Sequence, residues 1–102
     1  MVHVVAVITA KPGQRAAVLA AFNANVSAVR AEDGCIEYGA AVDSPEAGGW
    51  AAKYGEDSFV VIEKWASMAA LGAHAKSAHM AAYAAQTKDM LADRQVYVLT
   101  SA

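Results

Sequence analysis

Two histidines, a glutamate and a tryptophan stand close together in the segment EKWASMAALGAHAKSAHM, residues 63–80. Histidine is the side chain that exchanges a proton most readily near neutral pH, so His74 and His79 could each act as a general acid or base. A carboxylate such as Glu63 could orient one of these imidazoles. The alternative is that both histidines are half-buried boundary residues and that Glu63 is an exposed glutamate paired with a neighbouring lysine. The segment therefore predicts either a proton-transfer site or the ordinary edge of a strand and a helix.

The spacing of the two histidines argues against a metal site. Zinc-binding histidines on one helix usually stand four residues apart, which places both side chains on one face. Here the spacing is five, or about 140° around a continuous helix, and Ser77 is expected to break the helix between them. Cys35 is the only cysteine, which excludes an intrachain disulfide and a cysteine-based cage, and we interpret it as a small buried apolar residue. We expect no metal.

The last helical segment carries a polar line beside an apolar stripe. The line has the spacing i, i+4, i+7 and consists of His79, Tyr83 and Gln86. The stripe beside it consists of Met80, Ala84, Thr87 and Leu91. Residues with these spacings share one helix face, so the line is expected to edge a pocket between this helix and the sheet.

The elements that position these residues follow from apolar periodicity and from local stop signals. Apolar or alternating runs predict strands at 2–10, 35–43, 59–65 and 94–101, with a further short strand expected at 50–54. Helices are expected at 14–32, from Ser67 to about residue 75, and from Ser77 to about residue 91, each serine acting as an N-cap. Gly34 is expected to end the first helix in a left-handed conformation.

The order of these elements predicts an α+β fold formed by residues 1–102 as one domain. It reads β-α-β-β-α-β, the order of the ferredoxin-like arrangement, in which an antiparallel sheet carries both helical regions on one face. The strands at 2–10 and 59–65 are apolar on both faces. The face without helices therefore needs a cover, and we expect a homodimer with its sheets packed face to face.

Charge and hydropathy exclude several other partners. The net charge is −2 and the pI is near 5.8, and the lysines and arginines are scattered singly, so a nucleic-acid partner is not expected. The longest uncharged run, residues 16–29, is too short to cross a bilayer, so no membrane association is expected. The N-terminus lacks the features of a secretory signal, and a cytoplasmic location is expected.

Several motifs together resemble a known family. They are the helix start KPGQ, the segment EDGCIEYGAAVD at 32–43, and residues 57–83, which contain E-x-W at 63–65 and S-x-H-M-x-x-Y at 77–83. This combination resembles the antibiotic biosynthesis monooxygenase superfamily of dimeric α+β barrels, and within it the small bacterial quinol monooxygenases. The likeness covers nearly the whole chain.

The resemblance implies a cofactor-independent monooxygenase that oxidises a small quinol or polyphenol with O₂ in a pocket between helices and sheet. An electron-rich phenolate can reduce O₂ itself, so the protein supplies a base, donors and a dry pocket. The catalytic residues implied are His74, Glu63 and His79: either histidine could be the base or the donor, and Glu63 could orient one of them. The substrate-binding residues implied are Tyr83, Trp65, Tyr38 and Met80.

The sequence also leaves other functions open. The haem-degrading branch of the superfamily uses Asn, Trp and His at positions that hold Ile8, His74 and Ala84 here, so haem degradation is not expected. A non-catalytic dimeric module that binds a small molecule or acts in a stress response would use the same pocket. An isomerase of a small phosphorylated metabolite would need anion-binding groups, and the local lysines read more naturally as solvated charges.

Overall fold

The computed structural model describes residues 1–102, and its strands follow the apolar runs of the sequence. The four strands are β1 (Val2–Ala10), β2 (Cys35–Ala41), β3 (Ser58–Trp65) and β4 (Leu91–Thr100). The helices are α1 (Arg15–Arg30), α2 (Met68–Ala75), α3 (Ala78–Thr87) and a short 3-10 helix, η1 (Lys88–Met90). The expected order of elements is confirmed, with the second helical region divided in two.

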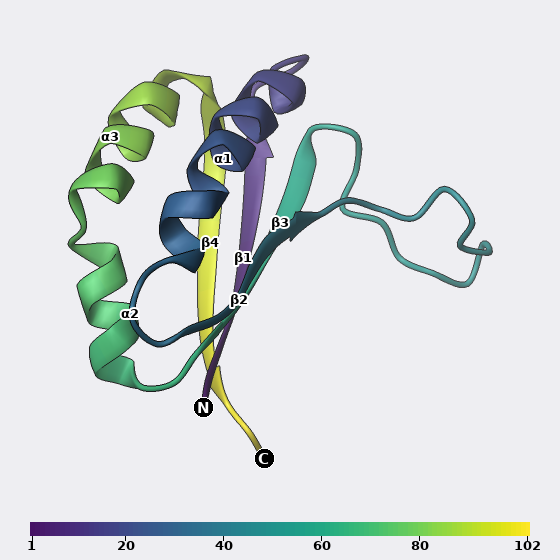
Figure 1. Ribbon diagram of the computed structural model, residues 1–102. Helices are drawn as coiled ribbons and strands as arrows, with labels where there is room; N and C mark the ends of the chain where they lie inside the picture. Colours follow the sequence, from purple (N-terminus) through teal and green to yellow (C-terminus); the bar gives the residue numbers. More distant parts are fainter.

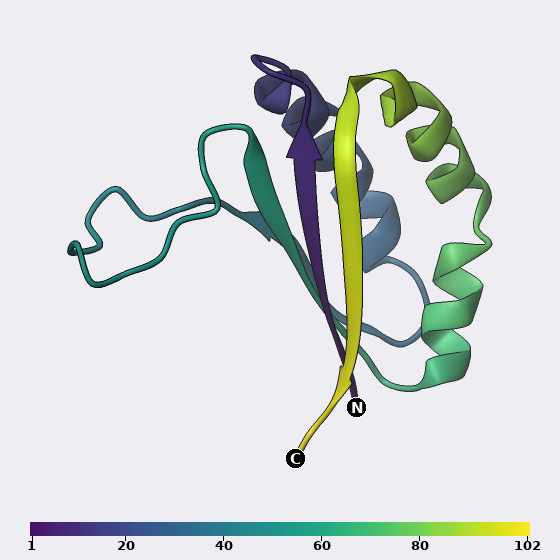
Figure 2. The same cartoon turned by 180° about the vertical axis from the view of Figure 1, so that it is seen from behind.

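The four strands form one antiparallel sheet in the order β2-β3-β1-β4. All three α-helices lie on the same side of this sheet (Figure 1), and the opposite side carries no helix (Figure 2). This is the ferredoxin-like arrangement, so the predicted α+β fold is confirmed. The sheet of the single chain is open at both edges and does not close into a barrel.

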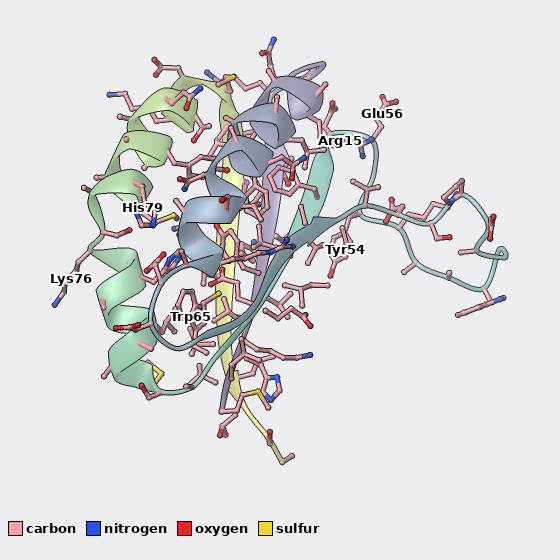
Figure 3. The ribbon with its side chains drawn as sticks, in the orientation of Figure 1. Arg15, Tyr54, Glu56, Trp65, Lys76 and His79 are labelled. Carbon is pink, nitrogen blue, oxygen red and sulfur yellow. The ribbon has the colours of Figure 1, made fainter.

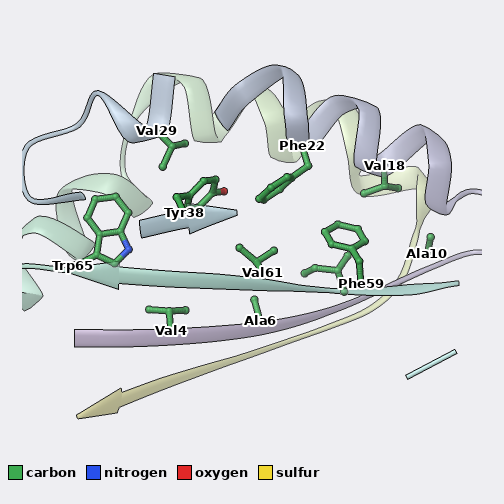
Figure 4. Packing of buried hydrophobic residues seen from close by; sticks show 11 residues of the cluster. Val4, Ala6, Ala10, Val18, Phe22, Val29, Tyr38, Phe59, Val61 and Trp65 are labelled. Atoms are coloured by element: carbon green, nitrogen blue, oxygen red, sulfur yellow. The ribbon is translucent and has the colours of Figure 1, made fainter. Parts of the chain in front are cut away.

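Alternating burial along β1, and along β3 from Phe59 onward, builds the core between the sheet and α1. Val4, Ala6 and Ile8 are buried against the helices, whereas the residues between them face the other side of the sheet. Phe22 of α1 stacks on Tyr38 of β2, with ring centroids 5.1 Å apart, and the close view in Figure 4 shows both rings between α1 and the sheet. The sheet thus supplies a fixed layer of buried side chains on which the helices that carry the site residues pack.

The break between α2 and α3 falls where the two serines predict it. The Ser67 hydroxyl accepts a hydrogen bond from the Ala70 N–H at the start of α2. The Ser77 hydroxyl accepts one from the Met80 N–H at the start of α3, and it also donates to the His74 carbonyl at 2.8 Å. Ser77 therefore ends one helix and begins the next. None of the helices is long and apolar enough to cross a membrane.

Several elements differ from the expectations: α1 ends at Arg30 rather than at residue 32, and β2 ends at Ala41 rather than at residue 43. The expected strand at 50–54 is wrong, because residues 42–57 form a long loop that projects from the sheet (Figures 1 and 2). The exposed Asp43 carboxylate closes the base of this loop by accepting the N–H groups of Tyr54 and Gly55, both at 2.9 Å, and these bonds lower the pKa of Asp43. The last helix ends at Thr87 rather than near residue 91, and β4 begins three residues early.

Gly34 lets α2 approach the start of β2 closely. Its φ is +83°, the left-handed conformation expected from the sequence. A Cβ atom at this position would lie 2.6 Å from the Ala70 Cβ, and the Gly34 carbonyl accepts the Ala66 N–H at 2.8 Å. The close approach matters for the site because α2 carries His74.

Gly34→Ala is expected to lower the free energy of unfolding by roughly 2–3 kcal/mol, since it adds a clash with Ala70 to the backbone strain. Gly13→Ala is the matched control, because Gly13 has a φ of +79° and no atom near its missing Cβ. The control should lose only about 1 kcal/mol. Urea unfolding of both variants measures the difference, and equal losses would show that α2 can move aside freely.

Candidate active site

A cavity of about 390 Å³ lies between the helix side of β1 and β4 and the two helices α2 and α3. Its walls are mostly apolar, and the three side chains that can carry a charge are Glu63, His74 and Arg94. The apolar wall consists of Val4, Ala6, Leu71, Ala75, Met80, Ala81, Ala84, Val96 and Val98. A mostly apolar cavity with few convergent polar groups is the usual form of a small-molecule site.

His74 is held rigidly at one end of this cavity. It is 4 % exposed, and its ring lies against the Trp65 indole with centroids 4.6 Å apart. The Tyr38 ring meets it edge to face at 5.6 Å. Packing on both sides fixes the orientation of the imidazole, which a proton-transfer residue requires.

Glu32 joins the two histidines, and sequence reasoning missed this residue. One oxygen, Oε2, lies 2.8 Å from Nδ1 of His74 and 2.9 Å from Nε2 of His79. Glu32 lies in the turn after α1, two residues before Gly34. The only signal in the sequence is an acidic residue in the EDG turn next to the glycine. Nothing local connects that turn to histidines more than forty residues away.

The two histidines also decide the ionisation of Glu32. Burial by itself would raise the pKa of the Glu32 carboxyl, but the hydrogen bonds and charges of His74 and His79 together outweigh it and lower the pKa. Glu32 is therefore a carboxylate at neutral pH, and a carboxylate only accepts hydrogen bonds. It follows that His74 carries a hydrogen on Nδ1 and His79 carries one on Nε2.

Glu63 stands on the other side of the His74 ring. Its Oε1 lies 3.9 Å from Nε2 of His74 and accepts the Trp65 indole N–H at 2.8 Å. The alternative of an exposed glutamate paired with a lysine is wrong, because Glu63 is 8 % exposed and Lys64 pairs instead with Glu37. Glu63 and Trp65 are two residues apart on β3 and so point to the same face.

These contacts leave one nitrogen of His74 available for chemistry. With Nδ1 protonated and bound to Glu32, Nε2 of the neutral ring bears a lone pair. Nε2 is the ring atom near Glu63, which lines the cavity. When Nε2 takes a proton, the imidazolium lies between two carboxylates that stabilise its charge. The geometry is that of a general base with an orienting carboxylate.

Of the four expected substrate-binding residues, two line cavities and two are buried in the core. Met80 lines the cavity, and Tyr83 lines a neighbouring one of about 300 Å³. Trp65 and Tyr38 lie in the hydrophobic core and reach the site only through His74 and Glu63. Burial raises the pKa of the Tyr38 phenol, which therefore stays neutral.

The spacing predicted that the polar line on α3 edges the space between this helix and the sheet, and the structure shows this for Tyr83 alone. His79, Tyr83 and Gln86 line a shallow depression between α1 and α3. The side chain of His79 points from the start of α3 toward the turn that holds Glu32, whereas Lys76 points into solvent (Figure 3). His79 therefore supports Glu32 from outside the cavity.

Glu32, His74 and His79 are also the one group of side chains whose donor atoms converge enough to hold a metal ion, all within 4.8 Å of one another. The short distances join one carboxylate oxygen to two ring nitrogens, and both are ordinary hydrogen-bond lengths. Metal ligands instead direct lone pairs at a common point. The geometry is that of a hydrogen-bonded network.

Glu32→Gln is expected to lower turnover at this site by about 10- to 100-fold, because a neutral amide no longer fixes the His74 tautomer. Ionised Glu32 stabilises the folded state above its ordinary pKa, and that contribution is lost as the pH falls through the lowered folded value. The difference in free energy of unfolding between wild type and variant should be full at neutral pH and shrink below about pH 4.

Urea unfolding of Glu32→Gln at several pH values measures this difference. Glu46→Gln, in the exposed part of the loop, removes the same charge without touching a histidine and should show no such pH dependence. A constant difference between wild type and Glu32→Gln across the acid range would contradict the ionised network.

Comparison with known proteins identifies a family. The family model described as antibiotic biosynthesis monooxygenase matches residues 1–86. The chain is 39 % identical over 101 residues to "Probable quinol monooxygenase YgiN" of Escherichia coli K12, covering 97 % of this chain and 96 % of that protein. The Shigella flexneri protein of the same name matches equally well.

Solved structures agree with the sequence matches. PA3566 from Pseudomonas aeruginosa superposes with a TM-score of 0.82 at 27 % identity, covering 99 % of this chain and 93 % of that one. Rv0793 from Mycobacterium tuberculosis gives 0.81 at 29 % identity, with 99 % and 94 % covered. The relatives support a monooxygenase activity. The chain belongs to the antibiotic biosynthesis monooxygenase family.

Proposed function

We propose that this protein oxidises a small quinol or polyphenol with O₂, without a cofactor, in the cavity beside His74. The observation that supports this most is the arrangement of Glu32, His74 and Glu63, which leaves a basic nitrogen at the edge of an apolar cavity. The similarity to a protein named a probable quinol monooxygenase supports the choice of substrate class.

The proposed reaction begins with removal of a hydroxyl proton by Nε2 of His74. The resulting anion is electron-rich at the ring carbon ortho to the oxygen-bearing carbon, and this carbon reacts with O₂ to form a peroxide. Protonation of this peroxide by His74 and loss of the hydrogen from the same ring carbon then cleave the O–O bond, which leaves one oxygen atom on the ring and releases the other as water. A quinol with a free ring position and O₂ thus give a hydroxyquinone and water.

Each residue of the site has a role in this scheme. Glu32 holds His74 in the reactive tautomer, and His79 helps to keep Glu32 ionised and in place. Glu63, held by the Trp65 indole, stabilises the imidazolium that forms. The apolar walls exclude water, which strengthens these electrostatic effects and protects the anion from reprotonation.

The test is oxygen uptake by protein treated with a chelator, using a set of quinols and polyphenols. Uptake above the rate of autoxidation, with one ¹⁸O atom from ¹⁸O₂ in the product and no hydrogen peroxide released, is the expected result. Hydrogen peroxide as the product would indicate an oxidase. Ligand binding without any oxygen uptake would favour the non-catalytic binding module.

We also propose that the protein acts as a homodimer through the face of the sheet that carries no helix. That face is apolar and holds a depression of about 410 Å³ lined by Val5, Val7, Tyr54, Gln95, Tyr97 and Leu99. Leu99 and Tyr97 are about half exposed in the single chain. Exposed apolar area of this kind is typical of a contact surface, and a second copy of the same face would cover it symmetrically.

A further inference from the structure

The cavity beside His74 continues into a second one along α3. The second cavity has a volume of about 300 Å³ and shares Met80, Ala84 and Arg94 with the first. Because three wall residues are common to both, the two spaces adjoin at Arg94. The wall of the combined space includes His74 of α2 in the first cavity and Lys88, just beyond the end of α3, in the second.

The two ends of this space differ in charge. Glu63 and His74 line only the first cavity, Lys88 lines only the second, and Arg94 lies where the two adjoin; the second cavity has no carboxylate in its wall. Neither Arg94 nor Lys88 takes part in an ion pair; the pairs in the chain involve Lys64 and the two site histidines. The second cavity is therefore electropositive.

The sheet register directs Arg94 toward this space. Arg94 is opposite Ile8 on β1, and Ile8 is buried on the helix side of the sheet. Residues directly opposite each other on neighbouring strands point to the same face. The guanidinium therefore lies on the side of the helices, over the apolar wall, and its planar donor groups match a carboxylate.

We propose that Arg94, supported by Lys88, binds an anionic substituent of the substrate while a ring hydroxyl of the same molecule reaches His74. This inference rests on the proposed function and narrows the substrate class to hydroxylated aromatics that carry a carboxylate or a similar anion. The hydroxyl is deprotonated at the end that holds Glu63 and His74. The anionic group is kept at the opposite end, away from Glu63, and so sets the direction in which the ring enters.

The test compares two ligands that differ only in charge, 1,4-dihydroxy-2-naphthoate and 1,4-dihydroxy-2-naphthamide. Calorimetry under anaerobic conditions measures their binding without turnover. The wild type is expected to prefer the naphthoate, and Arg94→Gln to reduce that preference about tenfold, the usual size of a charge-assisted contact. Lys88→Gln should reduce it less, about two- to threefold, because an ammonium lacks the bidentate geometry.

Lys76→Gln is the matched control, since Lys76 is exposed, near the site in sequence and outside both cavities. It should keep the wild-type preference. In oxygen uptake the loss in Arg94→Gln should fall on KM for the naphthoate rather than on kcat, because the carboxylate is bound equally before and during the reaction.

The outcomes separate this inference from the proposed function. An unchanged preference in Arg94→Gln, or no preference in the wild type, would overturn the role of Arg94 even if both ligands are oxidised. Absence of oxygen uptake with both ligands would overturn the oxygenase, while an anaerobic preference lost in Arg94→Gln would still support the anion site.

Discussion

His74→Ala is expected to reduce oxygen uptake about 10²- to 10⁴-fold, the usual contribution of a positioned general base. His74 is the one histidine in the cavity wall, and its Nδ1 bond to Glu32 leaves Nε2 as the basic atom. Without the imidazole, the substrate hydroxyl must lose its proton to water, which is a far weaker base.

The alanine variant alone could lose activity by unfolding, because it also leaves Glu32 with one partner fewer. His74→Asn answers this objection, since the Asn side-chain amide can donate to Glu32 much as Nδ1 does but offers no base. It should be nearly as inactive as the alanine variant while melting close to the wild type. Circular dichroism and gel filtration measure the fold, and an oxygen electrode measures the activity.

His3→Gln serves as the control for removal of a histidine. His3 lies near the start of β1, outside the cavity, and its ring is hydrogen-bonded to the Ser101 hydroxyl at 2.9 Å. This variant should keep its activity. If His74→Asn retained more than about a tenth of the wild-type rate, the general-base assignment would fail.

Ile62→Glu is expected to break the proposed dimer, raising its dissociation constant by at least about 10³-fold. Ile62, Val5 and Tyr97 form one row across three strands on the face of the sheet without helices. Ile62 is 39 % exposed in the single chain, so a glutamate there remains hydrated in the monomer. In a symmetric interface the same carboxylate would be buried twice without a partner.

Analytical ultracentrifugation over a range of concentrations measures this effect. Ala17→Glu adds the same charge at an exposed position of α1, on the opposite side of the molecule, and should leave the dimer intact. If Ile62→Glu sedimented like the wild type, the open face would not be the contact. A monomeric wild type would remove the dimer altogether.

The proposed dimer also bears on the proposed activity, because β4 forms both one wall of the cavity and one edge of the open sheet. Val96 and Val98 point into the cavity, while Tyr97 and Leu99 point to the open face. Covering the open face would hold β4 in place and with it the cavity wall. Loss of the dimer is therefore expected to lower activity as a secondary effect, which the same oxygen-uptake assay measures.

The sequence by itself determined the features that depend on near neighbours in the chain. Continuous apolar runs predicted β1 and β3, and serine caps predicted the division between α2 and α3. The left-handed conformation of Gly34 was also predicted, although α1 ends earlier, with Ala31 as its C-cap. All of these follow from local sterics and local hydrogen bonds. The pairing of Glu63 with Trp65 could have been found in the same way, because both residues stand two apart on one strand.

The false strand at 50–54 shows where local reasoning stops. Two aromatic residues around alanines favour an extended chain, but a strand forms only when a neighbour pairs with it. The neighbour of β3 on that side is β2, and the Asp43 carboxylate takes the N–H groups of Tyr54 and Gly55 instead.

Only the tertiary structure decided the site. Glu32 lies 42 residues before His74 and 47 before His79, and its role depends on how the turn after α1 meets the break between α2 and α3. Local patterns carry no information about such a distance. The positively charged cavity also depends on tertiary structure. Arg94 lies on the side of the helices only because β4 pairs with β1 in this register. The sequence determines which side chains can exchange protons or bind charge, but only the packing of the elements brings them together in one site.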